Sequence, residues 1–408
     1  MQLAQEQIGQ PAMRSPQFRA NPFPFYAQLR AAAPVYQVHL SRRESIWLVT
    51  RYSDVLALLK DERFVKDRLQ AMTPEQQAKQ PWMPSMLKPL TRSMLTLDEP
   101  DHSRLRGLVH KAFTPRLIEE LRNRVQSLCD ELLDAAQRRG SMELIGDYAL
   151  PLPITIIAEM LGVPTRDRAK FHQWSRALIL VFSGSSQMLQ GLPQIWLFMR
   201  YLRQFFKQRR VQPGDDLTTA LIRAEEAGDR LSEDELLAMV MLLLIAGYET
   251  TVNLIGSGTL ALLQHPAQHL LLREDPALIK TAIEELLRYT SPVDCATERF
   301  AREDVVLNGV RIARGEQVRA VLGSANRDEE QFINPDKLDL TRDPNRHLAF
   351  GQGIHYCLGA PLARLEGQIA INTLLRRMPN LRLAVAPEQL CWRRGLSLRG
   401  LEQLPVTF

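Results

Sequence analysis

The stretch FGQGIHYCLG, residues 350–359, holds three glycines, one histidine and one cysteine within ten positions. Glycine loses much conformational freedom on folding and adds no side chain to a core, so this density indicates an unusual backbone path. Apolar residues recur with helical spacing in PLARLEGQIAINTLLRR, which follows at once. The sequence therefore places Cys357 just before a helix that begins at about Leu358 or Gly359.

A sulfur at that position has a defined chemistry. The partial positive charge and free N–H groups of a helix N-terminus stabilise a thiolate. Gly351, Gly353 and Gly359 would let a flat ligand and backbone amides approach the sulfur closely. A thiolate in such a pocket is a strong axial ligand for haem iron. The alternative is a buried free cysteine, the usual fate of a lone cysteine, and spacing alone does not separate the two.

Composition predicts a soluble globular protein. The chain has 408 residues, of which 45% are hydrophobic and 24% charged, and a net charge of +5. Its basic residues are scattered apart from FFKQRR (205–210), which favours a solvated helix face over a nucleic-acid surface. The four cysteines form no C-x-x-C pair, which indicates a reducing cytosol without a zinc ribbon or disulfide framework. We expect no membrane anchor, because the longest apolar run, 236–247, is shorter than the roughly 18 residues that span a bilayer and the N-terminus lacks a signal-peptide core.

The elements expected along the chain are mainly α-helical, with a minor β component. Strand patterns and turns, including an Asn-Gly turn, occupy about 31–60, 296–325 and 380–408. Helical patterns fill most of about 61–295 and 326–379, apart from a long irregular loop at 65–95. We expect one domain over 1–408, with a large helical body and a smaller sheet-rich part.

The cysteine stretch resembles the haem-binding loop of the cytochrome P-450 family, F-G-x-G-x-H-x-C-x-G, at every fixed position. The resemblance extends from NPFPFYAQLR to the C-terminal strands, closest to the soluble bacterial class. It implies the cytochrome P-450 fold, with haem b between a long kinked helix and the cysteine loop. It assigns Cys357 as the thiolate ligand of the iron, with Phe350 and Gly359 beside the cofactor and O2 as co-substrate.

The segment EELLR contains an E-x-x-R pattern, Glu285 and Arg288. On the residues alone, opposite charges at i and i+3 are common on solvated helices. In the family this pair binds a downstream loop and shapes the core on the haem side. We expect the partner to be Arg346 or a neighbour in DPNRHLAF.

The segment AGYETT (246–251) puts an acid and two hydroxyls into a long apolar helix that begins with a capping box, Ser232 and Glu235. A buried acid in such a helix is costly unless it is paired or functional. A helix kink without a catalytic role is the alternative. By resemblance Ala246 lies over the haem, Thr250 is the hydroxyl on the oxygen side, and Glu249 is the acid of a proton relay.

Two further segments match the family's haem-propionate residues. DHSRLRG places His102 and Arg106 at i and i+4, on one face of a helix. Propionates need cations or strong donors when they are buried. By resemblance His102, Arg106, Arg299 and His355 supply them, whereas each could instead be an ordinary surface charge.

The expected substrate pocket is apolar, with candidates Trp82, Met83, Leu243, Ala246 and Val293. The apolar lining favours a bulky hydrophobic substrate. The family resemblance implies hydroxylation of a C–H bond in a small molecule such as a polyketide, fatty acid, steroid or terpenoid. Helix cores are also apolar, so packing is the alternative for each residue.

Electrons must come from a separate protein, because no G-x-G-x-x-G lies beside a strand. We expect a ferredoxin or flavodoxin with an NAD(P)H-dependent reductase, docking on a basic face near His110, Lys111, Arg364 and Arg377. A cytoplasmic monomer that binds no nucleic acid is expected. The alternatives are a peroxide-driven peroxygenase, a redox-neutral haem enzyme, a non-catalytic haem sensor, and a helical protein with an inert Cys357.

Overall fold

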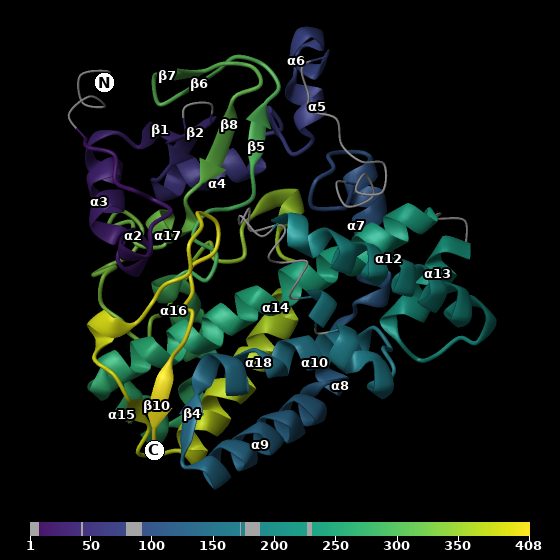
Figure 1. The fold of residues 1–408 in the computed structure, drawn as a ribbon. Coiled ribbons are helices and arrows are strands. Elements are labelled where there is room, and N and C mark those ends of the chain that lie inside the picture. Colours follow the sequence, from purple (N-terminus) through teal and green to yellow (C-terminus); the bar gives the residue numbers. More distant parts are fainter. Residues whose placement is uncertain (1–7, 42–43, 79–91, 172, 176–187, 227–230) are drawn as a thin grey trace. The chain divides into compact units, whose positions relative to one another are not determined.

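The computed structural model describes residues 8–41, 44–78, 92–171, 173–175, 188–226 and 231–408. The chain forms two compact units. The first comprises Met1–Gln80, Gln126–Ala149 and Thr250–Phe408, and the second Pro81–Val125 and Leu150–Glu249. The expectation of a mainly helical chain with a minor sheet is confirmed (Figure 1).

The main sheet of the first unit has five strands in the order β1-β2-β8-β5-β3. Only β2 and β8 run parallel, and the other neighbours are antiparallel. Its strands are β1 (Val35–Ser41), β2 (Glu44–Val49), β3 (Phe64–Val65), β5 (Arg299–Ala301) and β8 (Gln317–Ala320). The sheet thus joins the start of the chain to the segment that contains Arg299.

Smaller sheets complete the β component. A three-stranded sheet has the order β4-β10-β9, and β6 pairs with β7 as a hairpin. The strands are β4 (Ser141–Glu143), β6 (Val305–Leu307), β7 (Val310–Ile312), β9 (Arg382–Leu383) and β10 (Pro405–Thr407). Asn308 and Gly309 connect β6 to β7 with φ of 49° and 72°. Two positive φ values are what a two-residue hairpin turn requires, and they confirm the Asn-Gly turn.

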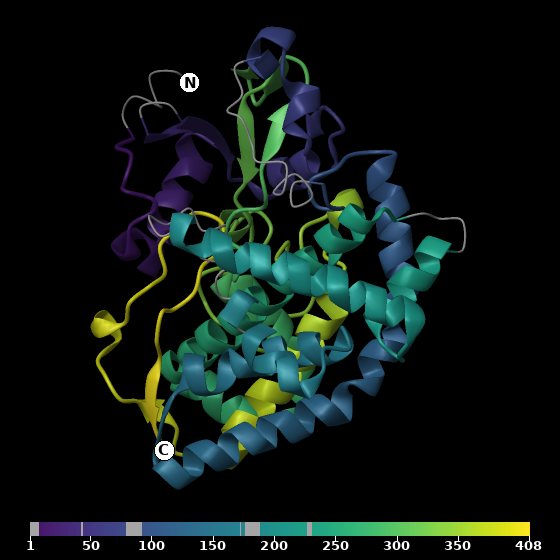
Figure 2. The same cartoon turned by 45° about the vertical axis from the view of Figure 1, so that its right-hand side comes forward.

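The helices of the first unit pack beside the sheet and around the cysteine loop. They are α2 (Pro16–Ala20), α3 (Phe23–Ala32), α4 (Tyr52–Lys60), α5 (Arg68–Ala71), α6 (Pro74–Ala78), most of α9 (Arg122–Arg139), α15 (Pro266–Glu274), α16 (Ile279–Thr290), α17 (Leu322–Ala325) and α18 (Ala360–Arg377). Helix α9 lies alongside α18 in two views (Figures 1 and 2), and ion pairs from Arg377 to Asp130 and Asp134 join them.

A glycine lets α18 approach its neighbours closely. A Cβ on Gly367 would lie 2.9 Å from Leu254 Cδ2 and 3.4 Å from Ile283 Cδ1. Leu254 and Ile283 belong to one buried cluster with Leu286 and Ile371. Because a Cβ at Gly367 would require the Leu254 side chain to shift, the glycine favours this close packing of α18. This packing anchors the helix that follows Cys357.

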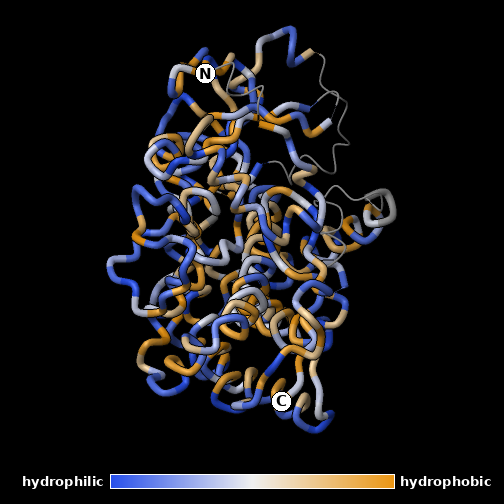
Figure 3. The backbone as a smooth tube through the Cα atoms, turned by 90° about the vertical axis from the view of Figure 1, so that its left-hand side faces the viewer, coloured by the Kyte–Doolittle hydropathy of each residue, from blue (hydrophilic) through white to orange (hydrophobic). Residues whose placement is uncertain are grey.

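The helices of the second unit carry the segment with His102 and Arg106. They are α7 (Asp101–Ala112), α8 (Pro115–Glu120), α10 (Pro151–Met160), α12 (Met188–Val211) and α13 (Leu217–Glu226). Helix α13 contacts both α7 and α12. In Figure 3 hydrophobic and hydrophilic residues alternate along the described helices, as amphipathic helices require.

Helix α14 (Glu233–Gln264) runs through both units and includes AGYETT. Its capping box is confirmed, because the Glu235 N–H donates to Ser232 Oγ (3.2 Å) and the Ser232 N–H donates to Glu235 Oε2 (2.7 Å). Among the described residues it is the one helix long and apolar enough to cross a bilayer, but 61% of its most apolar window is buried within the protein. The core helix of a soluble protein can have the same length and hydropathy.

Candidate functional site

The cysteine loop follows the path that its glycines predict. Gly351 and Gly353 have φ of 69° and 76°, the left-handed region that glycine adopts most easily. A 3₁₀ turn spans Gly353–His355, and the Cys357 N–H donates to the Phe350 carbonyl at 3.0 Å. Helix α18 then begins at Ala360 with Gly359 as its N-cap, so the predicted helix start is correct within two residues.

Cys357 differs from the two core cysteines. Burial raises the pKa of the Cys129 and Cys295 thiols to about 12 in each case, as expected for inert structural cysteines. Cys357 is half-buried, and a Cβ on Gly359 would still lie 4.0 Å from its sulfur. A Cβ on Gly351 would meet no atom within 4 Å. The residue two positions after the sulfur is thus a glycine that leaves space beside it, which fits a flat ligand approaching the sulfur.

Arg299 and the cysteine loop meet at one carbonyl oxygen. The buried Arg299 donates from Nη2 to the Leu59 carbonyl (3.1 Å) and from Nη1 to the Phe64 carbonyl (3.2 Å). A Cβ on Gly353 would lie 2.7 Å from the same Leu59 oxygen. The end of α4 thus places Arg299 beside the turn that contains His355. Arg299 and His355, two of the four predicted propionate residues, therefore belong to neighbouring segments.

Glu285 and Arg288 form a fully buried ion pair on α16, with distances of 2.7 Å and 2.8 Å. The expected partner in DPNRHLAF is confirmed, but it is Asn345 and not Arg346: Asn345 donates to Glu285 Oε2 at 3.1 Å. Arg342, just before that segment, donates to the same oxygen at 3.1 Å. Arg288 also donates to the carbonyls of Asn326, Pro335 and Lys337. The pair is therefore an internal anchor for the chain that leads into the cysteine loop, not a solvated surface pair.

Helix α14 has one incompletely covered stripe next to a fully buried stretch. Leu243, Ala246, Gly247 and Thr250, at i, i+3, i+4 and i+7, are half-buried or exposed. Residues 251–262 are all buried. The stripe is partly covered, since a Cβ on Gly247 would lie 2.7 Å from Ile157 Cδ1. Its partly exposed apolar residues, Leu243 and Ala246, are suited to contact a hydrophobic ligand. Glu249, also half-buried, precedes Thr250.

His102 and Arg106 lie on α7 in the second unit, four residues apart as predicted. The His102 side chain is almost fully buried, and its burial lowers the pKa of the imidazole. Glu99 Oε1 lies 3.5 Å from His102 Nδ1, and this carboxylate raises the pKa of the imidazole against the effect of burial. A neutral imidazole and an arginine on one helix face fit a shared anionic ligand such as a propionate.

The predicted substrate-pocket residues have different outcomes. Val293 is half-buried and pairs with Leu398 in an isolated β-bridge. Leu243 and Ala246 belong to the partly covered stripe of α14. Trp82 and Met83 lie outside the residues that the structure describes. That Trp82 and Met83 line a substrate pocket stays a prediction.

Sequence reasoning missed Glu366. This carboxyl on α18 is fully buried, and burial raises its pKa to about 8, while a hydrogen bond with Thr251 acts the other way. Thr251 follows Thr250 on α14. The signal was available, since LARLEGQIA puts an acid among the apolar positions of an amphipathic helix. The protonated Glu366 carboxyl can therefore hold a proton beside Thr251, the residue that follows Thr250.

Two of the basic residues expected on a docking face are already paired. Arg364 forms a bidentate ion pair with Glu284, and Arg377 pairs with Asp130 and Asp134. His110 is exposed at the end of α7. The two arginines are therefore weaker attractors of an acidic partner than unpaired cations would be.

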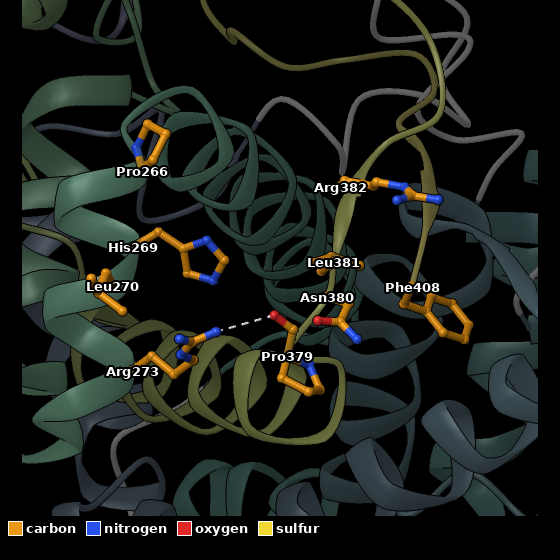
Figure 4. Close-up of a pocket in the computed structure, with 9 residues that line it drawn as sticks. All are labelled: Pro266, His269, Leu270, Arg273, Pro379, Asn380, Leu381, Arg382 and Phe408. Atoms are coloured by element: carbon orange, nitrogen blue, oxygen red, sulfur yellow. Dashed lines mark hydrogen bonds between the residues drawn. The ribbon is translucent and has the colours of Figure 1, made fainter.

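A groove of about 540 Å³ lies elsewhere, between α15 and the segment before β9 (Figure 4). His269 and Arg273 line one side, and Arg273 donates to the Pro379 carbonyl at 3.3 Å. None of the predicted site residues lines it. Its position makes it a surface feature separate from the cysteine loop.

The comparisons with known proteins agree with this geometry. The family model "Cytochrome P450" matches residues 16–388. The polyketide biosynthesis cytochrome P450 PksS of Bacillus subtilis is 45% identical over 395 residues, 96% of each chain. The myxobacterial cytochrome P450 CYP267B1, solved with myristic acid, is 43% identical with a TM-score of 0.91, over 98% of this chain and 99% of that one.

A third relative is P450BioI, solved with an acyl carrier protein that bears hexadec-9Z-enoic acid. It is 43% identical with a TM-score of 0.86, over 96% of this chain and 99% of that one. Matches of this identity and coverage establish the family. Its members bind haem b through a cysteine thiolate and use O2, with a small-molecule substrate and a redox partner. The chain belongs to the cytochrome P450 family and is a cytochrome P450 monooxygenase.

Proposed function

We propose that this monooxygenase hydroxylates a C–H bond of a hydrophobic small molecule of the fatty acid or polyketide type, with steroids and terpenoids as further classes. The observation that carries the proposal is the partly covered stripe Leu243, Ala246, Gly247 and Thr250, which ends in a hydroxyl next to an acid. An apolar surface with one polar end favours a long apolar substrate. The names of PksS and of the myristic acid complex support the same classes.

Cys357 is proposed as the ligand of the haem iron. Its half-buried sulfur precedes α18, whose N-terminal dipole favours the thiolate. Phe350 accepts the Cys357 N–H and shields the sulfur from water. By family resemblance, the propionates of the cofactor would be bound by His102, Arg106, Arg299 and His355. The bound haem supplies the activation of O2.

The proton chemistry is proposed to use the chain's own residues. Thr250 Oγ1 presents a proton on the partly covered face of α14, and Glu249, half-buried beside it, restores that proton from solvent. The Glu366 carboxyl, with a pKa raised to about 8 by burial, is a proton store behind Thr251.

The electrons are proposed to come from a ferredoxin or flavodoxin that an NAD(P)H-dependent reductase reduces. The sequence has no G-x-G-x-x-G beside a strand, which supports a separate donor. The enzyme is proposed to act as a soluble cytoplasmic monomer and as one domain over 1–408. Burial of most of the apolar window of α14 supports solubility.

Turnover with ¹⁸O2 tests the proposal. The purified enzyme, a ferredoxin, a ferredoxin reductase and NADPH are incubated with myristic acid and with a macrolactone as probes. One ¹⁸O atom in a hydroxylated product of either probe is the expected result. Product formed only with hydrogen peroxide, and none with the reducing system, would reverse the assignment in favour of a peroxygenase.

A further inference from the structure

The pattern EELLR contains two adjacent glutamates, and the structure gives them different partners. Glu285 faces inward to Arg288. Glu284 instead accepts from Arg364 Nε on α18 at 2.7 Å and from Arg364 Nη2 at 2.8 Å. These hydrogen bonds, with a further one from His347, outweigh the effect of burial and lower the pKa of Glu284 to about 2. The carboxylate is therefore ionised at any working pH.

The Glu284–Arg364 pair contacts two residues of the cysteine loop, Phe350 and Tyr356, and also His347 just before the loop. The Arg364 guanidinium carbon lies 4.5 Å from the centre of the Phe350 ring. Arg364 Nη1 is 3.4 Å from the Tyr356 hydroxyl. His347 Nδ1 accepts the Ala349 N–H (3.2 Å), which leaves the proton on Nε2 to be donated to Glu284 (3.1 Å).

Phe350 lies at the centre of these contacts. Besides the Arg364 guanidinium, its ring meets the Tyr356 ring edge-on at 6.4 Å and the His347 ring at 6.1 Å. Its carbonyl accepts the Cys357 N–H at 3.0 Å. A planar guanidinium held by two hydrogen bonds has little freedom to move, so it restrains an aromatic ring that it contacts. The orientation of the pair therefore determines where the Phe350 ring and the peptide bonded to Cys357 lie.

We infer that Glu284 and Arg364 are positioning residues that hold Cys357 in the geometry of a thiolate ligand, acting through Phe350. The inference rests on the proposed role of Cys357 as the iron ligand. Among the described residues, the contacts of Glu284 and Arg364 reach Phe350, Tyr356 and His347 but not the sulfur, so the effect is indirect. Loosening the pair should let the loop move, and the thiolate should then be protonated or displaced while the fold persists.

The same helix supplies a matched control. Arg377, also on α18, makes ion pairs with Asp130 and Asp134 on α9, as Arg364 does with Glu284 on α16. Arg377 contacts no residue of the cysteine loop in the described contacts. The variants Arg364→Lys and Glu284→Gln are therefore compared with Arg377→Lys and Asp134→Asn, in the haem-loaded enzyme.

The readout is the half-life, at one temperature, of the red-shifted Soret band of the reduced carbon monoxide complex, which only thiolate ligation gives. The half-life should fall at least threefold in Arg364→Lys and Glu284→Gln and stay within 1.5-fold of wild type in the two controls. In a Phe350→Leu background, Arg364→Lys should add little further loss, because the pair acts through that ring.

Three results would overturn the inference. They are unchanged half-lives in both test variants, equal losses in test and control variants, and full additivity with Phe350→Leu. A wild-type enzyme that binds haem without the red-shifted band would instead overturn the proposed role of Cys357, and the inference with it.

Discussion

Glu285 and Arg288 are both completely buried, and two hydrogen bonds of 2.7 Å and 2.8 Å join the carboxylate to the guanidinium. Arg288→Met would leave the Glu285 charge in the core with Arg342 as its remaining cation. Breaking a buried pair by removing one partner costs about 3–5 kcal/mol. We expect a loss of that size in the free energy of unfolding, measured by urea titration with circular dichroism.

The control for this change is Arg311→Met. Arg311 pairs with Asp304 on the surface, with side chains 72% and 48% exposed. Exposed pairs contribute at most about 1 kcal/mol. If both variants lost the same stability, the role of the buried pair as an anchor would be refuted.

Glu366 should make the stability of the enzyme depend on pH. Its folded pKa is raised to about 8 from an ordinary 4.5, so the folded state keeps a proton that the unfolded state releases between these values. The contribution of Glu366 to the free energy of unfolding is therefore complete below pH 4.5 and is lost as the pH rises towards 8. The loss is at most about 5 kcal/mol, from about 1.4 kcal/mol per pKa unit.

Glu366→Gln should remove this slope. We expect wild type to lose more stability than the variant between pH 5 and pH 8, measured by thermal unfolding at each pH. Parallel curves for the two proteins would show that the carboxyl is ionised in the fold. They would also remove it as a proton store.

Thr250→Ala should uncouple oxygen consumption from product. Without the hydroxyl, the acid at position 249 no longer has a neighbouring group on the partly covered face to relay its proton. We expect the ratio of product formed to NADPH consumed to fall roughly tenfold, since a positioned proton donor contributes about 10²–10⁴-fold to a rate. Hydrogen peroxide should make up the difference.

Thr341→Ala, which alters an exposed threonine far along the chain, is the control for this experiment. Coupling as tight in Thr250→Ala as in wild type would exclude the hydroxyl from the proton path.

Gly353→Ala should impair haem binding. The new methyl group would lie 2.7 Å from the Leu59 carbonyl, at a residue with φ of 76°. Both the contact and the positive φ disfavour a side chain, at about 1–3 kcal/mol for the backbone alone. We expect a lower haem-to-protein absorbance ratio after purification.

Gly9→Ala is the matched control, because a Cβ there meets no atom within 4 Å. A full haem content in Gly353→Ala would show that the turn can shift without loss of the site.

The sequence predicted the parts of the site that local sterics determine. The loop around Cys357 and the Asn308–Gly309 turn need backbone angles that only a few residues adopt. For the same reason the start of α18 was predicted within two residues. Apolar periodicity likewise predicted the long helix α14, and the Ser-x-x-Glu pattern predicted its capping box.

The partners of the charged residues depend on tertiary packing, which the sequence does not show. Glu284 and Glu285 are adjacent and chemically identical, so only the fold shows that one binds Arg364 and the other Arg288. The choice of Arg342 over Arg346 as a partner of Glu285 depends on the path of a loop without a periodic pattern. How His102 and Arg106 are placed relative to Cys357 remains a prediction from family resemblance.

The central claim is that the sulfur of Cys357 binds the haem iron. The absorbance difference between the reduced enzyme with and without carbon monoxide tests it most directly, in wild type and in Cys357→Ser. We predict the strongly red-shifted Soret band in wild type and its complete loss in the variant. A band of unchanged position in Cys357→Ser, or a wild-type enzyme that never shows it, would contradict the account.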